Sequence, residues 1–89
     1  MLKYPARFEP IEGGGFFVTF RDIPEAASQG LALEEALLVA ADTLSTAVGF
    51  YLEDRRSIPC PSSIEEGEEL VALSGSVSEK VLAFNKTLA

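Results

Sequence analysis

Two stretches near the start of the chain alternate between apolar and polar side chains. Residues 2–8 carry an apolar side chain at every second position, which is typical of a half-buried strand. Pro5 has no backbone N–H, so we expect one side of this strand to be free or only loosely paired near its start. Residues 16–20 are aromatic and β-branched, and three glycines at 13–15 permit a tight reversal between the two runs. The pattern predicts a β-hairpin.

The spacing of apolar positions changes from two to three or four between about Leu31 and Glu53. The apolar stripe consists of Leu33, Leu37, Ala40, Leu44, Ala47, Val48 and Tyr51. Glu34 and Glu35 near its start match the positive end of a helix dipole. This segment is predicted to be an amphipathic helix of about six turns, wide enough to cover a small sheet. Small residues at 26–30, just before it, predict a brief third strand.

The remainder of the chain predicts a connector, a last strand and a second helix. Residues 57–63 contain two prolines and should be extended, whereas the acidic run 65–69 is either a solvated turn or a contact for a basic partner. The apolar run 70–73 is expected to join the sheet. Ser76 and Glu79 match a capping box for a helix with an apolar stripe at 77, 81, 84 and 88. We therefore expect one folded unit over 1–73, with 74–89 as an oligomerisation helix or a linker to a further domain.

The net charge of the chain limits the kinds of molecule that it is expected to bind. The 89 residues contain 7 basic and 14 acidic side chains, for a net charge of −7. Nucleic-acid binding depends on cations that neutralise phosphates, so no direct nucleic-acid binding is expected. The charge suits a basic protein partner, and it is equally explained by solubility. We expect no signal peptide and no membrane span, because no apolar run approaches about 18–20 residues, and a cytoplasmic location is expected as a result.

The residues missing from the chain exclude several kinds of chemistry. There is no histidine, so the chain alone cannot build a Ser-His-Asp triad, a Cys-His dyad or a histidine-ligated zinc site. Its single cysteine, Cys60, cannot form an intrachain disulfide and is interpreted as an incidental thiol. Accordingly, we expect no metal, no cofactor and no enzymatic activity.

Specific residues resemble the N-terminal domain of HicB-type antitoxins. They are Tyr4-Pro5, Gly14-Gly15, the run FFVTFRDIPEA at 16–26, Gln29-Gly30 and the run LEEAL at 33–37. The segment 51–62 is similar to the segment after the long helix of that family. The resemblance covers roughly residues 2–73. It departs from the family at Ala32, where a capping threonine usually stands. Longer members add a C-terminal DNA-binding domain, which we do not expect within these 89 residues.

The resemblance implies a fold and a partner. The fold is α+β, with order β-β-β-α-β-α and a small antiparallel-rich mixed sheet covered on one face by a long helix, described in the family as partial ribonuclease-H-like. The implied partner is a HicA-like toxin, a small basic ribonuclease that cuts mRNA with its own histidine. This chain would therefore be the antitoxin of a type II toxin-antitoxin pair, and the alternative is a standalone oligomeric scaffold or sensing domain without a toxin.

Contact residues for this partner are expected in the loop after the second strand and in the hairpin turn. The candidates are Glu12, Asp22, Ile23, Pro24 and Glu25. Asp22 is also a candidate metal ligand of a ribonuclease-H-like site, but an aspartate before Ile-Pro more often satisfies backbone N–H groups. The small core, the short edge strands and the apolar stripe of the last helix predict a homo-oligomer, either a dimer or a tetramer.

Overall fold

The computed structural model describes residues 2–88, and its elements occur in the order expected from the sequence pattern. They are β1 (Lys3–Pro10), β2 (Phe16–Phe20), β3 (Ser28–Gly30), α1 (Leu33–Glu53), β4 (Glu68–Ala72) and α2 (Gly75–Leu88). The predicted α+β class and the order β-β-β-α-β-α are confirmed.

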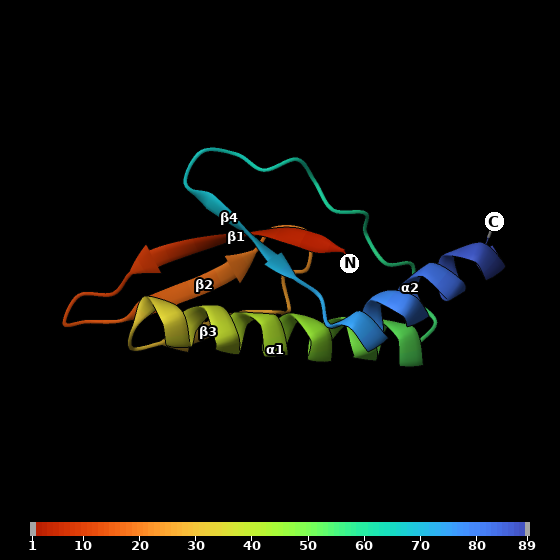
Figure 1. Ribbon diagram of the computed structural model, residues 1–89, viewed down its shortest axis with the longest axis horizontal. Helices are drawn as coiled ribbons and strands as arrows, with labels where there is room; N and C mark the ends of the chain where they lie inside the picture. Colours follow the sequence, from red (N-terminus) through yellow and green to blue (C-terminus); the bar gives the residue numbers. More distant parts are fainter. Residues whose placement is uncertain (1, 89) are drawn as a thin grey trace.

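The four strands form one sheet in the order β3-β2-β1-β4, with the N-terminal strand β1 near its centre (Figure 1). The pairing of β1 with β2 begins at Ala6, opposite Phe20, whereas the pairing with β4 already begins at Lys3, opposite Ala72. Pro5 therefore lies opposite β4 but beyond the end of the β2 ladder. This is the loosely paired side that the missing N–H of proline predicts.

The sheet is antiparallel in all three of its pairings, so the expectation of a mixed sheet is wrong. The reason lies in the connector, residues 54–67, which links α1 to β4. A parallel β4 would start beside Lys3, yet β4 starts opposite Arg7 and runs back toward Lys3. The extended connector thus carries the chain back along the sheet before the last strand begins, as Figure 1 shows.

Helix α1 lies along one face of the sheet, closest to β3 and β2 (Figure 1). Its buried side chains are Ala36, Ala40, Leu44, Ala47, Val48 and Tyr51, so the predicted stripe is confirmed from Ala40 onward. At the start of the helix the prediction is wrong, because Leu33 is exposed and Leu37 is half-buried. Small alanines let the helix approach β3 closely. At Gly30 an added Cβ would lie 2.6 Å from both the Cα and the backbone N of Ala36, so this position accepts only glycine.

An 18-residue window of α1 has a mean hydropathy of 1.3, so by length and composition alone the helix is able to cross a membrane. The expectation that no apolar stretch reaches this length is corrected in that respect. The core helix of a soluble protein passes the same test, and the face of α1 formed by its six buried residues packs against the sheet.

Helix α2 begins earlier along the chain than expected, because a different serine caps it. The Oγ of Ser74 accepts from the backbone N–H of Val77 at 3.3 Å, and its carbonyl accepts from the N–H of Ser78 at 2.8 Å. The predicted capping box of Ser76 and Glu79 is therefore wrong, since Ser76 lies inside the helix. Val81 and Phe84 are buried, and α2 packs beside α1 (Figure 1).

Replacing Ala32 with threonine is expected to raise the melting temperature by a few degrees. Ala32 occupies the N-cap of α1 with extended backbone and no side-chain hydrogen bond, while Glu35 Oε1 already accepts from the N–H of Leu31 at 2.7 Å. A threonine hydroxyl at this N-cap would accept from a free N–H of the first turn, which is worth about 1 kcal/mol. Thermal denaturation followed by circular dichroism measures the shift, with Ala32→Val as a β-branched control that cannot cap. An equal shift in both variants would contradict the capping argument.

Candidate functional site

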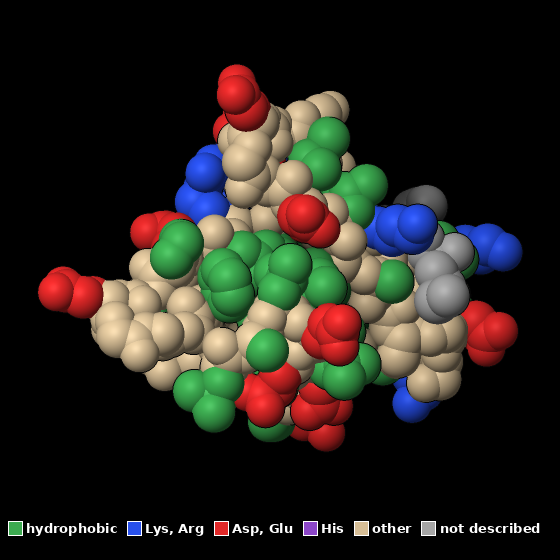
Figure 2. Space-filling view, turned by 60° about the vertical axis from the view of Figure 1, so that its left-hand side comes forward, with side chains coloured by type: hydrophobic (Ala, Val, Ile, Leu, Met, Phe, Trp, Pro, Cys, Tyr) green, Lys and Arg blue, Asp and Glu red, His purple; other side chains and the backbone are tan. Residues whose placement is uncertain are grey.

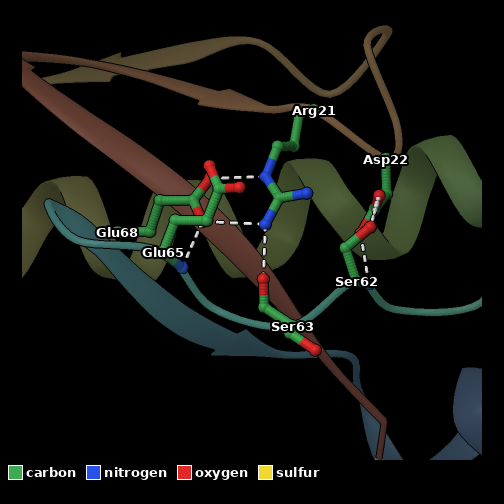
Figure 3. Close-up of polar contacts among 6 residues, drawn as sticks. All are labelled: Arg21, Asp22, Ser62, Ser63, Glu65 and Glu68. Atoms are coloured by element: carbon green, nitrogen blue, oxygen red, sulfur yellow. Dashed lines mark hydrogen bonds and ion pairs between the residues drawn. The ribbon is translucent and has the colours of Figure 1, made fainter.

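The loop after β2 is fastened to the connector by Asp22. Its Oδ2 accepts from the backbone N–H of Ser62 at 2.8 Å, and its Oδ1 accepts from the hydroxyl of Ser62 at 2.6 Å (Figure 3). Both oxygens of the carboxylate are thus used within the chain. Asp22 accepts from a backbone N–H, as expected, but the expectation of a contact within its own turn is wrong, because its partner Ser62 lies 40 residues away along the sequence.

A second contact, centred on Glu68, ties the same two segments together. Glu68 Oε2 accepts from Nε of Arg21 at 2.8 Å, and Oε1 accepts from Nη2 of Arg21 at 3.0 Å and from the N–H of Glu65 at 2.9 Å (Figure 3). Arg21 Nη2 also donates to the carbonyl of Ser63. The side chain of Glu68 is only 2% exposed. The arginine at the end of β2 therefore holds the connector, the acidic turn and the start of β4 in place.

The ion pair between Arg21 and Glu68 makes the folding stability of the chain depend on pH. The hydrogen bonds from Arg21 outweigh the opposing effect of burial and lower the pKa of Glu68 from 4.5 to about 2. Because the folded-state pKa lies below the unfolded one, this contribution is complete above about pH 4.5 and is lost as the pH falls toward about 2.

We expect Glu68→Gln to melt lower than the native chain at neutral pH, and we expect the difference to narrow as the pH falls through that window. Melting temperatures of both proteins over the same pH series measure this. A difference that stays constant down to about pH 2 would contradict the assigned role of the carboxylate.

Glu25, another of the predicted contact residues, lies at an open cleft of about 500 Å³ beside α1. Its Oε1 accepts from the hydroxyl of Tyr51 at 2.8 Å, and Arg56 Nη2 lies 3.4 Å from its Oε2. The Arg56 guanidinium stacks over the Tyr51 ring, with Cζ 3.9 Å from the centroid. The hydrogen bond from Tyr51 lowers the pKa of Glu25, so the carboxylate is ionised at neutral pH. Phe50 also lines the cleft and is 58% exposed.

The structure does not bring the five predicted contact residues together into one exposed group. Ile23 is fully buried in the core, so its side chain is not available to a partner. Pro24 and Glu25 are exposed, Asp22 is half-buried against Ser62, and Glu12 is exposed in the hairpin turn at the far end of β2. Only Pro24, Glu25 and Glu12 present side chains to solvent.

An apolar surface that the sequence analysis did not single out lies between the sheet and the start of α1. We call it the sheet–helix patch and define it by Phe8, Phe16, Leu37, Leu38 and Ala41. Four of them are half-buried, and Leu38 is 74% exposed. Figure 2 shows hydrophobic side chains gathered at the centre of the hairpin-side face, with acidic side chains around them. The sequence does contain an indication of this surface, because α1 has more apolar residues than a single buried stripe requires.

Side chains that could hold a metal ion are not clustered in the described part of the chain. Among residues 2–88, no three or more Asp, Glu, Cys or His side chains are arranged to hold a metal ion. Cys60 is exposed and unpaired with another cysteine. The described surface places acidic groups beside apolar ones, a combination that is common at protein interfaces.

Comparison with known proteins gives one consistent family. Residues 3–82 match the family described as "HicB_like antitoxin of bacterial toxin-antitoxin system". "Antitoxin HicB 1" of Photorhabdus laumondii is 48% identical over 87 residues, which cover 98% of this chain and 55% of the relative. "Antitoxin HicB" of Escherichia coli strain K12 is 41% identical over 87 residues, with 98% and 63% covered. "Antitoxin HicB" of Pseudomonas fluorescens is 36% identical over 78 residues, with 86% and 53% covered.

These relatives are longer proteins than this chain. The chain spans between half and two thirds of the length of the three relatives, so the similarity concerns that part of each. The family match covers all four strands, the whole of α1 and the first part of α2. The resemblance to HicB-type antitoxins is thus confirmed, and the chain belongs to the HicB-like antitoxin family of bacterial toxin-antitoxin systems.

Proposed function

We propose that this chain is a protein inhibitor that binds a small basic, HicA-like toxin and blocks its RNA-binding site. Membership of the HicB-like antitoxin family is the observation that carries the proposal. The net charge of −7 supports it, since acidic side chains complement the cations with which a ribonuclease holds phosphate. The role is non-catalytic, and the chain contributes occlusion rather than chemistry.

Association between such oppositely charged proteins should be fast and sensitive to salt. Exposed acidic side chains lie on several elements, including Glu34 and Glu35 on α1 and Glu69 on β4. Their combined field speeds encounter with a basic surface and is screened within about 8–10 Å at physiological ionic strength. An association rate that falls steeply with added salt is therefore part of the proposal.

Co-expression tests the proposed function directly. A small basic HicA-like toxin, sought in the reading frame next to this chain's gene, is induced alone, with the 89-residue chain, and with a chain carrying Leu44→Asp as an unfolded control. We expect the native chain to restore growth and to co-purify with the toxin, and the control to do neither. Continued growth arrest with a soluble, folded native chain would overturn the proposal that this part of the protein suffices for inhibition.

We also propose a cytoplasmic homo-oligomer, a dimer or a tetramer, in which residues 1–73 bind the toxin and 74–89 contribute to assembly. The described strands leave β3 and β4 as sheet edges, and Leu82 on α2 is 52% exposed. Unpaired edges and exposed apolar side chains on a helix favour association. Light scattering that gives a monomer at micromolar concentration would overturn this assembly.

A further inference from the structure

The sheet–helix patch is made by two strands and a helix that meet at the hairpin end of the sheet. Phe8 pairs with Val18 and Phe16 pairs with Pro10, so the two phenylalanines are diagonal neighbours on the face that α1 covers. Leu37 and Ala41 lie one turn apart on α1, on the flank of its buried stripe. Helix α1 lies closest to β3 and β2, so Phe8 on β1 is left half-buried, while Tyr4 and Ala6 farther along the strand are fully buried.

The borders of this patch are acidic. Glu34 lies one turn before Leu38 on α1 and is exposed. Glu69 pairs with Ala6, so it lies on the same face of the sheet as Phe8, and it is also exposed. In Figure 2 acidic side chains surround the central hydrophobic group on several sides. An apolar centre with a charged border is the usual anatomy of a protein interface.

The acidic residues around the sheet–helix patch favour a basic partner over a second copy of this chain. Two copies of this chain joined through the patch would bring Glu34 and Glu69 of each next to those of the other, in molecules that each carry −7. Like charges placed together in this way disfavour association. An amphipathic segment with apolar side chains in the middle and Lys or Arg at its edges would cover the apolar centre of the patch and pair with its acidic border.

We propose that the sheet–helix patch is the surface on which the basic toxin docks, through an amphipathic segment whose apolar side chains cover Phe8 and Leu38 and whose cations meet Glu34 and Glu69. This inference rests on the proposed antitoxin function and adds a location to it. It also moves the principal contact away from the loop after β2, whose Asp22 and Ile23 are occupied within the chain.

Matched substitutions test this surface. Leu38→Glu and Glu34→Lys alter the patch, whereas Leu70→Glu and Glu53→Lys make the same changes away from it. Leu70 pairs with Pro5 and therefore lies on the opposite face of the sheet from Phe8. Leu38 and Leu70 are 74% and 47% exposed, so neither change should unfold the chain. The probe is the HicA-like toxin of the co-expression test, made harmless by replacement of its catalytic histidine. Affinity is measured by titration calorimetry, and light scattering gives the oligomeric state of each variant.

We expect both patch variants to weaken toxin binding by about tenfold or more and both controls to stay within about twofold. Equal affinities for patch and control variants would overturn the inference and leave the antitoxin function intact. Loss of self-association in Leu38→Glu with unchanged toxin affinity would assign the patch to a second copy and overturn it as well. No binding by the native chain would overturn the proposed function itself.

Discussion

Replacing Gly30 with alanine is expected to destabilise the protein by about 3 kcal/mol and to lower its melting temperature by roughly 12–24 °C. The new Cβ would lie 2.6 Å from two backbone atoms of Ala36 and 2.9 Å from its Cβ. Backbone atoms do not move aside as the end of a side chain does, so α1 and β3 must separate. Separation costs packing along the whole contact between the helix and this edge of the sheet.

Gly49→Ala is the matched control, because it is the same substitution on the same helix. An added Cβ at Gly49 meets nothing within 4 Å, and alanine is the better helix former by about 1 kcal/mol. We expect this variant to melt at a higher temperature than the native chain. Denaturant titrations measure the free energy of unfolding, which we expect to fall in Gly30→Ala and to rise in Gly49→Ala. A Gly30→Ala protein as stable as the native one would show that β3 and α1 do not pack as described.

Truncation of Leu44 to alanine is expected to cost about 3 kcal/mol, within the usual range for a fully buried leucine. Leu44 is completely buried at the middle of α1, and its removal would leave a cavity between the helix and the sheet. The free energy of unfolding, obtained from urea titration, measures the loss. Because α1 carries three residues of the sheet–helix patch, the same change should also weaken toxin inhibition in proportion to the unfolded fraction.

Leu38→Ala is the control for the loss of stability in Leu44→Ala. Leu38 lies on the same helix and loses the same atoms, but it is 74% exposed, so the change should fall within about 0.5 kcal/mol. Similar losses for the two variants would contradict the assignment of faces on α1. The comparison also shows whether exposed positions of the helix tolerate substitution, on which the docking test depends.

The parts of the fold that local patterns describe were predictable from the sequence. The alternation over residues 2–8 and the glycines at 13–15 identified the hairpin, and the spacing of apolar residues identified α1 to within two residues at its start. These patterns report which side of an element is buried, and that information is contained in neighbouring residues. The family resemblance added an expected function and partner, and the match to the HicB-like family confirms the resemblance itself.

Contacts between distant residues were not predictable in the same way. Arg21 and Glu68 are 47 residues apart and Asp22 and Ser62 are 40 apart, and no local pattern links an aspartate to the N–H of one particular serine. The direction of β4 depends on the path of the connector, which two prolines stiffen without determining where it leads. The start of α2 was misplaced because both Ser74 and Ser76 are good caps, and the end of β4 decides between them.

The position of β1 governs the order in which the molecule is able to fold. It is the first of the four strands to be synthesised and its neighbour β4 is the last, so the sheet is completed only after Ala72 has been made. The hairpin and α1 close over short separations, whereas β1 and β4 must close a loop of roughly 60 residues, whose entropic cost is met late. A ribosome-bound chain that ends before β4 would thus expose an unpaired edge of β1, including Tyr4 and Ala6, which the finished protein conceals.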